Sequence, residues 1–381
     1  MSKPTKKRWK GCSVEEEFFG EERKKGKAQR KIVTSTDRSQ YKKTDQDKIK
    51  KRALLIQEVL DKDQDHLWRG RVLSVVSQGI IVSYEGKNFL CELKGLLKKD
   101  KTQHKNLVTV GDWVRFQELA PNQGQIISVE ARSTVLSRAD NLSRRKVQLI
   151  AANIDQVLIT VSVVSPQLKP SIVDRYIIAT EKGGMQPIIV INKIDLLKSK
   201  TEDPFILQET EMYEEFVRAY SAAGIPLISV SADTGEGIEA LREVMTNKSS
   251  VFSGQSGVGK SSLITAITGL DLKVGPIVDK TQKGAHTTSN ASLLPLEFGG
   301  WCIDTPGIKS FGVWDLQKDE IESYFTEIHA YGLQCKFPDC THAHEEDCAV
   351  QQAVDAGDLS PVRYDSYQAL MSSVNEVHVR R

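Results

Sequence analysis

Hydrophobic and polar positions follow two different patterns along this chain. Between His66 and about Thr134 they form five short runs with a period of two, separated by Gly, Asn and Asp: WRGRVLSVVS, GIIVSYEG, KNFLCEL, GDWVRFQEL and GQIISVEA. Such alternation is typical of strands that bury one face. Five strands of this kind predict a small antiparallel barrel or sandwich, and the OB-fold is the commonest five-stranded form.

The middle of the chain changes to near-continuous apolar runs that alternate with helical patterns, from IDQVLITVSV at 154–163 to IPLISVSA at 225–232. Strands that are apolar on both faces, linked by helices, predict a parallel sheet covered on both sides. Another strand and helix follow in SSVFSG and KSSLITAITGL, and WCIDTPG ends one more strand. The stretch RSTVLSRADNLSRRK is expected to be a linker, and the tail from about Asp319 is expected to be helical.

Residues 254–261, GQSGVGKS, fit the phosphate-binding pattern G-x-x-x-x-G-K-[ST] between a predicted strand and a predicted helix. Glycines let backbone N–H groups approach phosphate oxygens, and the helix N-terminus adds the positive end of its dipole. Lys260 is expected to contact the β- and γ-phosphates, and Ser261 to bind Mg²⁺. The expected nucleotide-binding residues here are Gly254, Gln255, Ser256, Gly257, Val258, Gly259, Lys260, Ser261 and Ser262.

A second motif, NKID at 192–195, fits the N-K-x-D pattern that reads guanine. The Asp195 carboxylate can accept from the guanine N1–H and from the exocyclic amine, a donor pair that adenine lacks. Asn192 can bridge toward N7 and a neighbouring loop, while the stem of Lys193 covers the base. Ser231 and Ala232 follow another strand and supply N–H groups for guanine O6. Alone, the tetrapeptide is equally consistent with a charged loop after a strand.

Two further matches concern the γ-phosphate and Mg²⁺. The sequence DTPG fits D-x-x-G, in which Asp304 holds Mg²⁺ through water and the Gly307 N–H senses the γ-phosphate. The segment GAHTTS offers Thr287 or Thr288 as the threonine that completes the coordination of Mg²⁺, and the spacing does not choose between them. The expected Mg²⁺ ligands are therefore Ser261, Thr287 or Thr288, and Asp304.

The residue after D-x-x-G is Ile308, where Ras-like GTPases carry the Gln that orients the attacking water. We therefore predict slow intrinsic hydrolysis. His286 or a group from a partner could position the water instead, and the alternative for His286 is a solvated loop histidine. The expected catalytic residues are Lys260, His286, Thr287, Thr288, Asp304 and Gly307.

The motifs occur in an unusual order, because the base reader comes before the phosphate loop. From Ile154 the chain runs through N-K-x-D, the Ser-Ala loop, the phosphate loop, the threonine segment and D-x-x-G. This is the usual order of a P-loop GTPase cut before the strand that leads to N-K-x-D. A circular permutation of this kind keeps every strand in place while moving the chain ends.

The charges are unevenly distributed. Residues 1–52 contain 18 Lys and Arg and 8 Asp and Glu, a net charge of +10, whereas the remaining residues contain 34 and 42, a net charge of −8. Residues 1–62 are expected to form a disordered or partly helical basic arm that contacts nucleic acid, since bound cations release the counterions of phosphates. The alternative is a solubilising tail.

Six cysteines in 381 residues are too few for a disulfide scaffold, and three of them lie within CKFPDCTHAHEEDC. Cys335, Cys340, His342 and Cys348 form a Cys₃His set that suits structural Zn²⁺, with His344 as the rival histidine. Cys12, Cys91 and Cys302 are interpreted as ordinary residues. The chain has no apolar core of signal-peptide length at its start, and we expect a cytoplasmic monomer without a membrane partner.

The combination and order of these motifs closely resemble the RsgA (YjeQ) family of circularly permuted, small-ribosomal-subunit-dependent GTPases. The resemblance covers about residues 66–375 and rests on VGDWV, NKID, GQSGVGKSSL, GAHTTS, DTPG and CKFPDCTHAHEEDC. It implies a multidomain protein with an N-terminal β-barrel (OB-fold) at 63–138, a circularly permuted α/β P-loop GTPase at 150–317 and a helical zinc-binding domain at 318–381.

The resemblance also implies rRNA binding, stimulation of GTP hydrolysis by the small ribosomal subunit, and a role in its late maturation. At Ala285 the chain departs from the longer polar residue, such as Arg, that the family commonly carries. Three alternatives remain: a guanine-nucleotide switch with negligible hydrolysis, an RNA-binding scaffold with a vestigial phosphate loop, and an ATPase.

Overall fold

The structure, a computed structural model, describes residues 67–94, 107–140, 143–198, 203–269, 291–304 and 316–379. Several predictions from the sequence lie outside these residues. They concern the basic arm, the segment with His286, Thr287 and Thr288, and the positions of Gly307 and Ile308.

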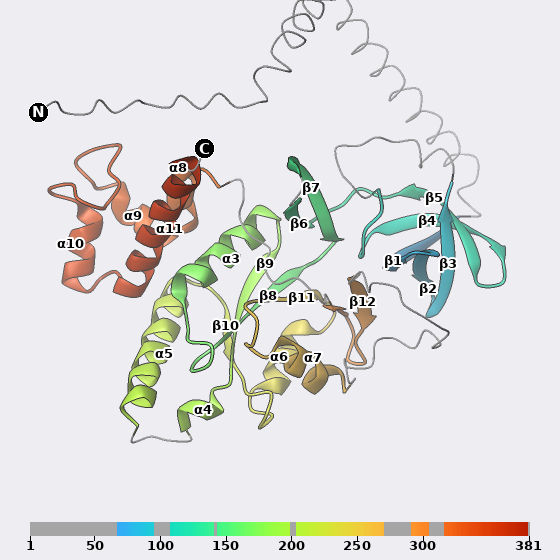
Figure 1. Cartoon of the computed structure of the whole chain (residues 1–381), viewed down its shortest axis with the longest axis horizontal. Helices are drawn as coiled ribbons and strands as arrows, with labels where there is room; N and C mark the ends of the chain where they lie inside the picture. Colours follow the sequence, from blue (N-terminus) through green and yellow to red (C-terminus); the bar gives the residue numbers. More distant parts are fainter. Residues whose placement is uncertain are drawn as a thin grey trace, which may run out of the picture. The chain divides into compact units, whose positions relative to one another are not determined.

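The predicted five-stranded barrel is present (Figure 1). Its strands are β1 (Trp68–Val76), β2 (Gly79–Tyr84), β3 (Lys87–Leu93), β4 (Trp113–Ala120) and β5 (Gln123–Val129). They are ordered β1-β2-β3-β5-β4, and a β1–β4 pairing closes the barrel. Every pairing is antiparallel except β3–β5. The alternating apolar residues point inward, with Val72, Val82, Val114, Phe116 and Ile126 fully buried.

The prediction of a linker at residues 132–146, RSTVLSRADNLSRRK, was wrong, because this segment contributes to a two-stranded hairpin. The strands are β6 (Val135–Asp140) and β7 (Ser143–Ala152). Apolar residues occur mainly at the base of this ribbon, where Leu136 pairs with Ala151 and both are buried in the core of the parallel sheet. Backbone pairing and these few apolar contacts stabilise the two strands, although their sequence lacks the alternation of apolar and polar residues that predicts a strand.

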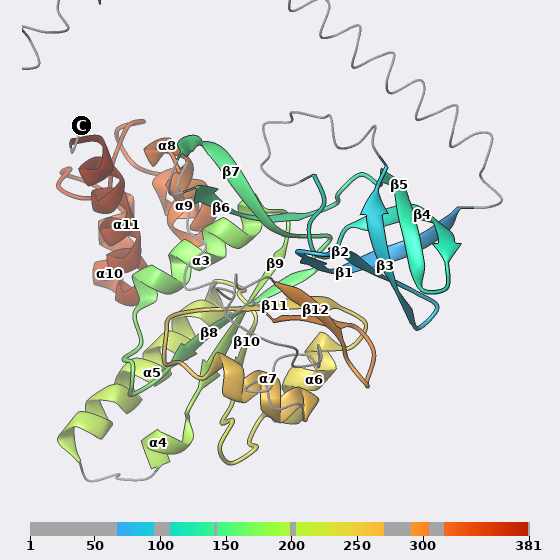
Figure 2. The same cartoon turned by 45° about the vertical axis from the view of Figure 1, so that its right-hand side comes forward.

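The predicted parallel sheet is also present, ordered β10-β9-β8-β11-β13-β12, with β12 alone antiparallel to its neighbour. The strands are β8 (Gln156–Ser162), β9 (Gln186–Asn192), β10 (Leu227–Ser229), β11 (Ser249–Ser253), β12 (Ser292–Pro295) and β13 (Trp301–Asp304). Figure 2 shows helices on both faces. They are α3 (Pro170–Lys182), α4 (Asp195–Lys198), α5 (Pro204–Ala222), α6 (Ile238–Met245) and α7 (Lys260–Thr268).

Alternate residues of the central strand β8 enter the cores on the two faces. Val157 and Ile159 pack with Tyr176 of α3 and Phe216 of α5 in one hydrophobic core. Leu158 packs on the other side, with residues of α6 and α7. Continuous burial of β8 explains why its sequence shows a run of apolar residues rather than an alternation.

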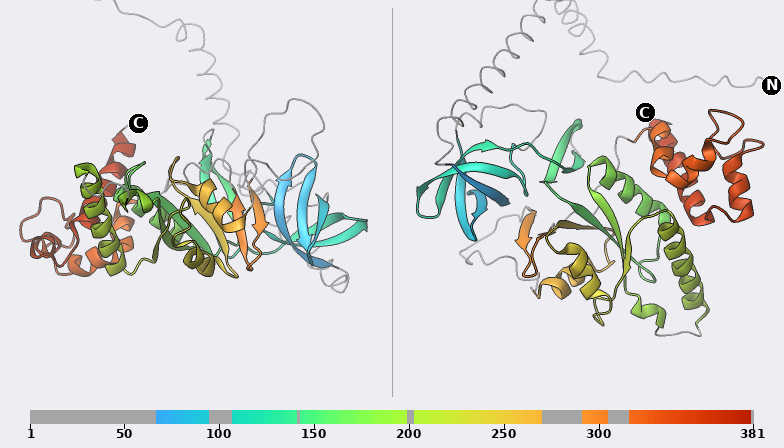
Figure 3. Two further views of the ribbon diagram at one scale, coloured as in Figure 1. Left: turned by 90° about the horizontal axis from the view of Figure 1, so that it is seen from below. Right: turned by 180° about the vertical axis from the view of Figure 1, so that it is seen from behind.

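The barrel and the parallel sheet join through one antiparallel pair, Ser74 of β1 with Ser292 of β12, so that eleven strands form a continuous sheet. Figure 3 shows β12, in orange, beside β1, in blue. A pairing between residues this far apart in the chain has no local sequence signal.

The C-terminal part is helical, as predicted. It contains α8 (Lys318–Ile321), the 3₁₀ turn η3 (Glu322–Tyr324), α9 (Thr326–Gly332), α10 (Ala349–Ala356) and α11 (Pro361–Val379). These helices surround their own hydrophobic core, which includes Phe325, Ile328 and Tyr367 and also takes in Ile178 of α3. Within the described residues, no helix is long and apolar enough to cross a membrane.

A buried polar network ties α11 to α3 and α5. Arg363 forms ion pairs with Asp174 of α3 and with Glu327, and its guanidinium lies over the rings of Tyr220 and Phe325. The Tyr220 hydroxyl donates to Asp174 Oδ2 at 2.8 Å. Burial, and then the charge of Asp174, raise the pKa of Tyr220 well above its usual value, so the hydroxyl remains a donor.

We expect Tyr220→Phe to lower the free energy of unfolding by about 2 kcal/mol, because a buried carboxylate loses one of its donors. Urea unfolding followed by circular dichroism would measure the change. Tyr213→Phe is a matched control on the same helix, since among the described residues its hydroxyl bonds only to the neutral Ser229 Oγ, and we expect it to cost about 1 kcal/mol or less. Equal effects of the two substitutions would contradict a special role for the charged network.

Candidate nucleotide-binding and metal sites

The phosphate loop connects the end of β11 to the start of α7, as the sequence predicts. Gly254 has φ 147°, and a Cβ added to it would lie 2.0 Å from the carbonyl oxygen of Thr160. Gly259 has φ 95°, and a Cβ there would lie 2.3 Å from Asn192 Nδ2. Side chains at these two positions would therefore push the loop away from β8 and from the N-K-x-D loop.

Lys260 begins α7 and its ammonium lies over the phosphate loop. Nζ donates to the carbonyl oxygens of Gly254 at 2.8 Å and Gln255 at 2.7 Å. Burial lowers the pKa of Lys260 from its ordinary value. Ser261 and Ser262 follow in the first turn of α7 and are exposed, whereas Val258 is buried beneath the loop. Ser256 and Gly257 form the exposed tip.

Asn192 connects the three loops expected to bind the nucleotide. Its Nδ2 donates to the Val258 carbonyl at 2.9 Å, and its Oδ1 accepts from the Ala232 N–H at 3.1 Å. Asn192 is 1% exposed, so this amide bridge is shielded from water. Lys193 adds a second link, since its Nζ donates to the Gly257 carbonyl at 2.7 Å. The structure therefore brings together the N-K-x-D, Ser-Ala and phosphate loops.

Asp195 is held in place by the Ser-Ala loop. The fully buried Ser231 donates its hydroxyl to Asp195 Oδ1 at 2.6 Å, and Ser231 Oγ accepts from the Thr234 N–H at 3.1 Å. This bond orients the carboxylate for a base with two adjacent donors, as in guanine.

Asp304 ends β13, and its backbone is described whereas its side chain is not. Because β13 runs parallel to β11, with Ile303 beside Val251, Asp304 and the start of the phosphate loop lie at the same edge of the sheet. Of the predicted Mg²⁺ ligands, the described residues therefore include the side chain of Ser261 alone.

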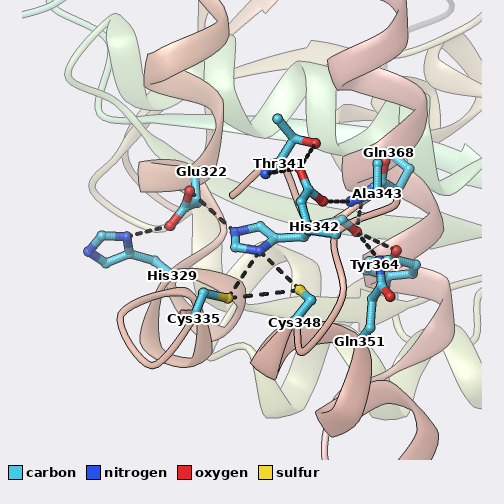
Figure 4. A network of polar contacts seen from close by, with 11 residues as sticks. Glu322, His329, Cys335, Thr341, His342, Ala343, Cys348, Gln351, Tyr364 and Gln368 are labelled. Atoms are coloured by element: carbon cyan, nitrogen blue, oxygen red, sulfur yellow. Dashed lines mark hydrogen bonds and ion pairs between the residues drawn. The ribbon is translucent and has the colours of Figure 1, made fainter. Parts of the chain in front are cut away.

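The cysteine–histidine cluster lies between α9 and α10 in the chain. Figure 4 shows Cys335, His342 and Cys348 with their side chains turned toward one another. The ligand atoms of Cys335, Cys340, His342 and Cys348 all lie within 4.8 Å of one another. The Sγ atoms of Cys335 and Cys348 are 3.8 Å apart, and His342 Nδ1 lies 3.5 Å and 3.4 Å from them. His344, the rival histidine, does not belong to this cluster.

These separations fit a tetrahedral zinc ion. Zn–S bonds of about 2.3 Å and Zn–N bonds of about 2.0 Å at the tetrahedral angle place two sulfurs about 3.8 Å apart and a sulfur and a nitrogen about 3.5 Å apart. Three thiols and one imidazole also form a donor set that zinc prefers. The cluster could therefore hold Zn²⁺ with no position open for a substrate.

Glu322 is a functional candidate that sequence reasoning missed. The buried His342 Nε2 has no hydrogen-bond partner among the described residues, but it lies 3.5 Å from Glu322 Oε2. Glu322 Oε1 bonds to His329 Nδ1 at 2.9 Å. A carboxylate behind a ligating imidazole fixes the tautomer in which the other nitrogen is free for metal. Glu322 lies in another turn, twenty positions earlier, so no spacing rule points to it.

Backbone contacts of the ligand loop orient His342 further. Its carbonyl oxygen accepts from the Tyr364 hydroxyl at 2.6 Å and from the side-chain amides of Gln351 and Gln368 at 3.1 Å and 2.9 Å. The carboxylate of Glu345 accepts from the N–H groups of Thr341, Ala343 and His344. The loop around the cluster is therefore anchored to α10 and α11.

Comparisons with known proteins show the family to which the chain is similar. Residues 129–314 match the model of the RsgA GTPase family. The small ribosomal subunit biogenesis GTPase RsgA of Saccharophagus degradans is 34% identical over 321 residues, which cover 82% of this chain and 91% of that protein.

Two solved structures also resemble this one. YjeQ from Thermotoga maritima is 32% identical, with a TM-score of 0.62 and coverage of 81% of this chain and 98% of that chain. YloQ, described as a circularly permuted GTPase, is 26% identical, with a TM-score of 0.62 and coverage of 82% and 96%. With this fold, these loops and relatives matched over most of its length, the chain belongs to the RsgA GTPase family.

Proposed function

We propose that this chain is a GTPase that binds the small ribosomal subunit and acts in its late maturation, hydrolysing GTP to GDP and phosphate with stimulation by the subunit. The observation that most supports nucleotide binding is the Asn192 bridge, because one buried amide fixes the base-reading loop against the phosphate loop. The names of its relatives, small ribosomal subunit biogenesis GTPases, support a role with that subunit. Such a protein works in the cytoplasm, where the subunits are.

The residues have the following roles in the proposal. Asp195 reads guanine, and the Ala232 N–H, which donates to Asn192 Oδ1 in this structure, turns to guanine O6 when the base is bound. The phosphate-loop N–H groups with Lys260 bind the phosphates. Mg²⁺ would be held by Ser261, by Thr287 or Thr288, and by Asp304, and when bound it neutralises charge on the phosphate oxygens. The Gly307 N–H contacts the γ-phosphate, and His286 is the candidate for positioning the water.

The proposal includes a domain layout. The barrel is assigned as an OB-fold at 63–138, followed by a circularly permuted GTPase domain at 150–317 and a helical domain at 318–381 with structural Zn²⁺ on Cys335, Cys340, His342 and Cys348. The strand order β12-β13-β11-β8-β9-β10 with its loops at one edge supports the permutation. The basic arm at 1–62 and the barrel are proposed to contact rRNA, with the chain acting as a monomer.

A second function has a specific observation in its favour. Ile308 replaces the usual water-orienting Gln, which fits a guanine-nucleotide-gated RNA-binding assembly factor with negligible hydrolysis. The two functions differ in turnover, not in nucleotide affinity.

Steady-state hydrolysis of GTP and ATP, with and without isolated small ribosomal subunits, tests the proposal. We expect slow turnover of GTP alone, stimulation of at least about tenfold by small subunits, and no stimulation of ATP hydrolysis. Isolated large subunits serve as the control for nonspecific RNA. Tight GTP binding without any stimulated turnover would instead favour the assembly factor, and failure to bind GTP would contradict both functions.

A further inference from the structure

Arg71 of β1 is a barrel residue whose side chain leaves the barrel and reaches the parallel sheet. It is 6% exposed. Its Nη2 donates to the Ser249 hydroxyl at 2.8 Å and to the Asn153 carbonyl at 2.9 Å. Ser249 is the first residue of β11, the strand that leads into the phosphate loop. A barrel side chain thus bonds directly to the first residue of that strand, which Asp155 also contacts.

The same guanidinium contacts the strand that ends at Asp304. Its central carbon lies 5.3 Å from the ring centre of Trp301, the first residue of β13, and 5.3 Å from that of Trp113 in β4. Both distances lie within the range of cation–π attraction. Arg71 therefore links a barrel strand on one side to β11 and β13 on the other.

Burial of the Arg71 charge costs folding free energy, so stability alone does not explain its position. Burial lowers its pKa to about 10, and the charge of Asp155 only partly opposes this effect. The hydrogen bonds of Arg71 to described residues go to neutral acceptors, the Ser249 hydroxyl and the Asn153 carbonyl, and its Nε has no hydrogen-bond partner among these residues. An apolar side chain at a buried charged position is often as stabilising as the charge. Stability therefore does not explain why a guanidinium occupies this position. Its contacts with β11 and β13, which lead to the phosphate loop and to Asp304, offer an explanation.

A second connection joins the barrel to β12, which follows Thr287 and Thr288 in the chain. Ser74 of β1 pairs with Ser292 of β12, a few residues after those threonines in the chain. Strand β1 therefore contacts the strands that adjoin the phosphate loop, the D-x-x-G motif and the threonine segment. A shift of the barrel relative to the sheet would act on all three.

We propose that Arg71 is a positioning residue that couples the barrel to nucleotide hydrolysis, by transmitting movement of β1 to β11 and β13. This inference rests on the proposed function, in which the barrel contacts the small subunit. By linkage, the coupling also acts in the opposite direction, so the bound nucleotide influences the barrel.

The first test compares Arg71→Met with wild type in GTP affinity, basal turnover, stimulated turnover and binding to small subunits. We expect affinity, basal turnover and subunit binding within about twofold of wild type, and stimulation reduced about tenfold, because couplings between sites are typically 5- to 150-fold. Arg71→Lys keeps the charge and one donor, and should restore part of the stimulation. Loss of stimulation caused only by weaker subunit binding would overturn the proposal.

Arg69→Met is the matched control. Arg69 lies on the same strand and over the same Trp113 ring, at 4.1 Å, but it is exposed and pairs with Glu130, the residue after β5. Its replacement should leave stimulation unchanged. If Arg71→Met does not fold, Ser249→Ala removes one of the two acceptors and should lower stimulation about threefold, a fraction of the same coupling. Full stimulation in folded Arg71→Met or folded Ser249→Ala would overturn the inference.

Hydrogen exchange of β1 separates this inference from the proposed function, since it needs no ribosomal subunit. In wild type, exchange of the β1 amides should differ between the GDP-bound and the GTP-analogue-bound protein, and Arg71→Met should abolish the difference. If wild-type turnover is not stimulated by subunits, the proposed function fails while this readout still decides the inference. Equal β1 exchange in the two nucleotide states of wild type would overturn the coupling itself.

Discussion

Asp195→Asn is expected to change the nucleotide preference from GTP to xanthosine triphosphate. An Asp carboxylate accepts from both the N1–H and the exocyclic amine of guanine, whereas an Asn amide places a donor opposite that amine. Two hydrogen bonds to a charged acceptor are each worth about 1.5–3 kcal/mol, so the affinity for GTP should fall roughly 100-fold or more. Xanthine carries a carbonyl in place of the amine and accepts from the new donor.

The hydrogen bond from Ser231 can be kept when Asn replaces Asp195. Ser231 donates to Asp195 Oδ1 at 2.6 Å, and the same hydroxyl can donate to the amide oxygen of an Asn. The amide nitrogen is then left to face the base, where xanthine O2 would lie. We therefore expect xanthosine triphosphate to bind the variant at least about 100-fold more tightly than it binds wild type.

Competition binding with GTP, ATP and xanthosine triphosphate measures the effect. Asp233→Asn is the matched control, because it removes the same charge from an exposed position just after the Ser-Ala loop and should leave the preference for GTP intact. If Asp195→Asn still prefers GTP, the N-K-x-D motif does not read the base in this chain. Equal loss of all three nucleotides would indicate a damaged fold rather than altered base reading.

Sequence patterns predicted the elements whose residues contact their own neighbours along the chain. The barrel strands show a period of two because one face packs on Val72, Val114 and similar residues, and the helix after Gly259 follows a phosphate-loop pattern that depends on contiguous residues. Both signals lie within windows of about ten residues. The predicted loops meet because parallel strands end at a common edge, which follows from topology.

Contacts between distant parts of the chain could not be predicted in this way. Arg71 bonds to Ser249 and Arg363 to Asp174 across more than 170 positions, and neither pair has any local pattern. The hairpin at β6 and β7 was missed for a related reason, since its polar sequence is stabilised at its base by Leu136 in the core of another sheet. Long-range packing overrides local pattern in both cases.

The metal cluster likewise combines a local sequence signal with a contact between distant residues. Three cysteines and two histidines within fourteen residues, from Cys335 to Cys348, predicted the candidate donor set from spacing, with His344 as the rival to His342. The choice of His342 over His344 depends on the turn at His342, which has φ 59° and points its Nδ1 toward the sulfurs. The carboxylate of Glu322 behind it comes from a separate turn, and only the folded chain brings it there.

Removal of zinc is expected to unfold the C-terminal helices. Structural zinc contributes on the order of 10 kcal/mol to small zinc-binding folds, because the thiolates and imidazole form no site in the unfolded chain. Cys348 is 3% exposed and belongs to the hydrophobic core between α9, α10 and α11, so loss of the ion disturbs that core directly. Cys348→Ser should lose the single zinc and much of the helical circular dichroism of this part.

Metal analysis of the purified protein and chelator titration measure the effect, and two histidine variants provide the matched pair. His342→Ala should lose zinc, whereas His344→Ala should retain one ion per chain and normal thermal stability. Retention of zinc in His342→Ala, or loss in His344→Ala, would contradict the ligand set. A protein without any bound metal and with intact helices would contradict the site altogether.

The consequence should extend beyond the metal site, because α11 carries Arg363. When this helix unfolds, Asp174 loses its ion pair with Arg363, and the packing of α11 on α3 is lost. Loss of one partner of a buried ion pair destabilises a protein by up to about 3–5 kcal/mol. Zinc removal should therefore lower the thermal stability of the parallel sheet as well, although GTP, bound by loops at the edge of that sheet, should still bind. A sheet that melts at the same temperature with and without zinc would show that the Arg363 network does not couple the two parts.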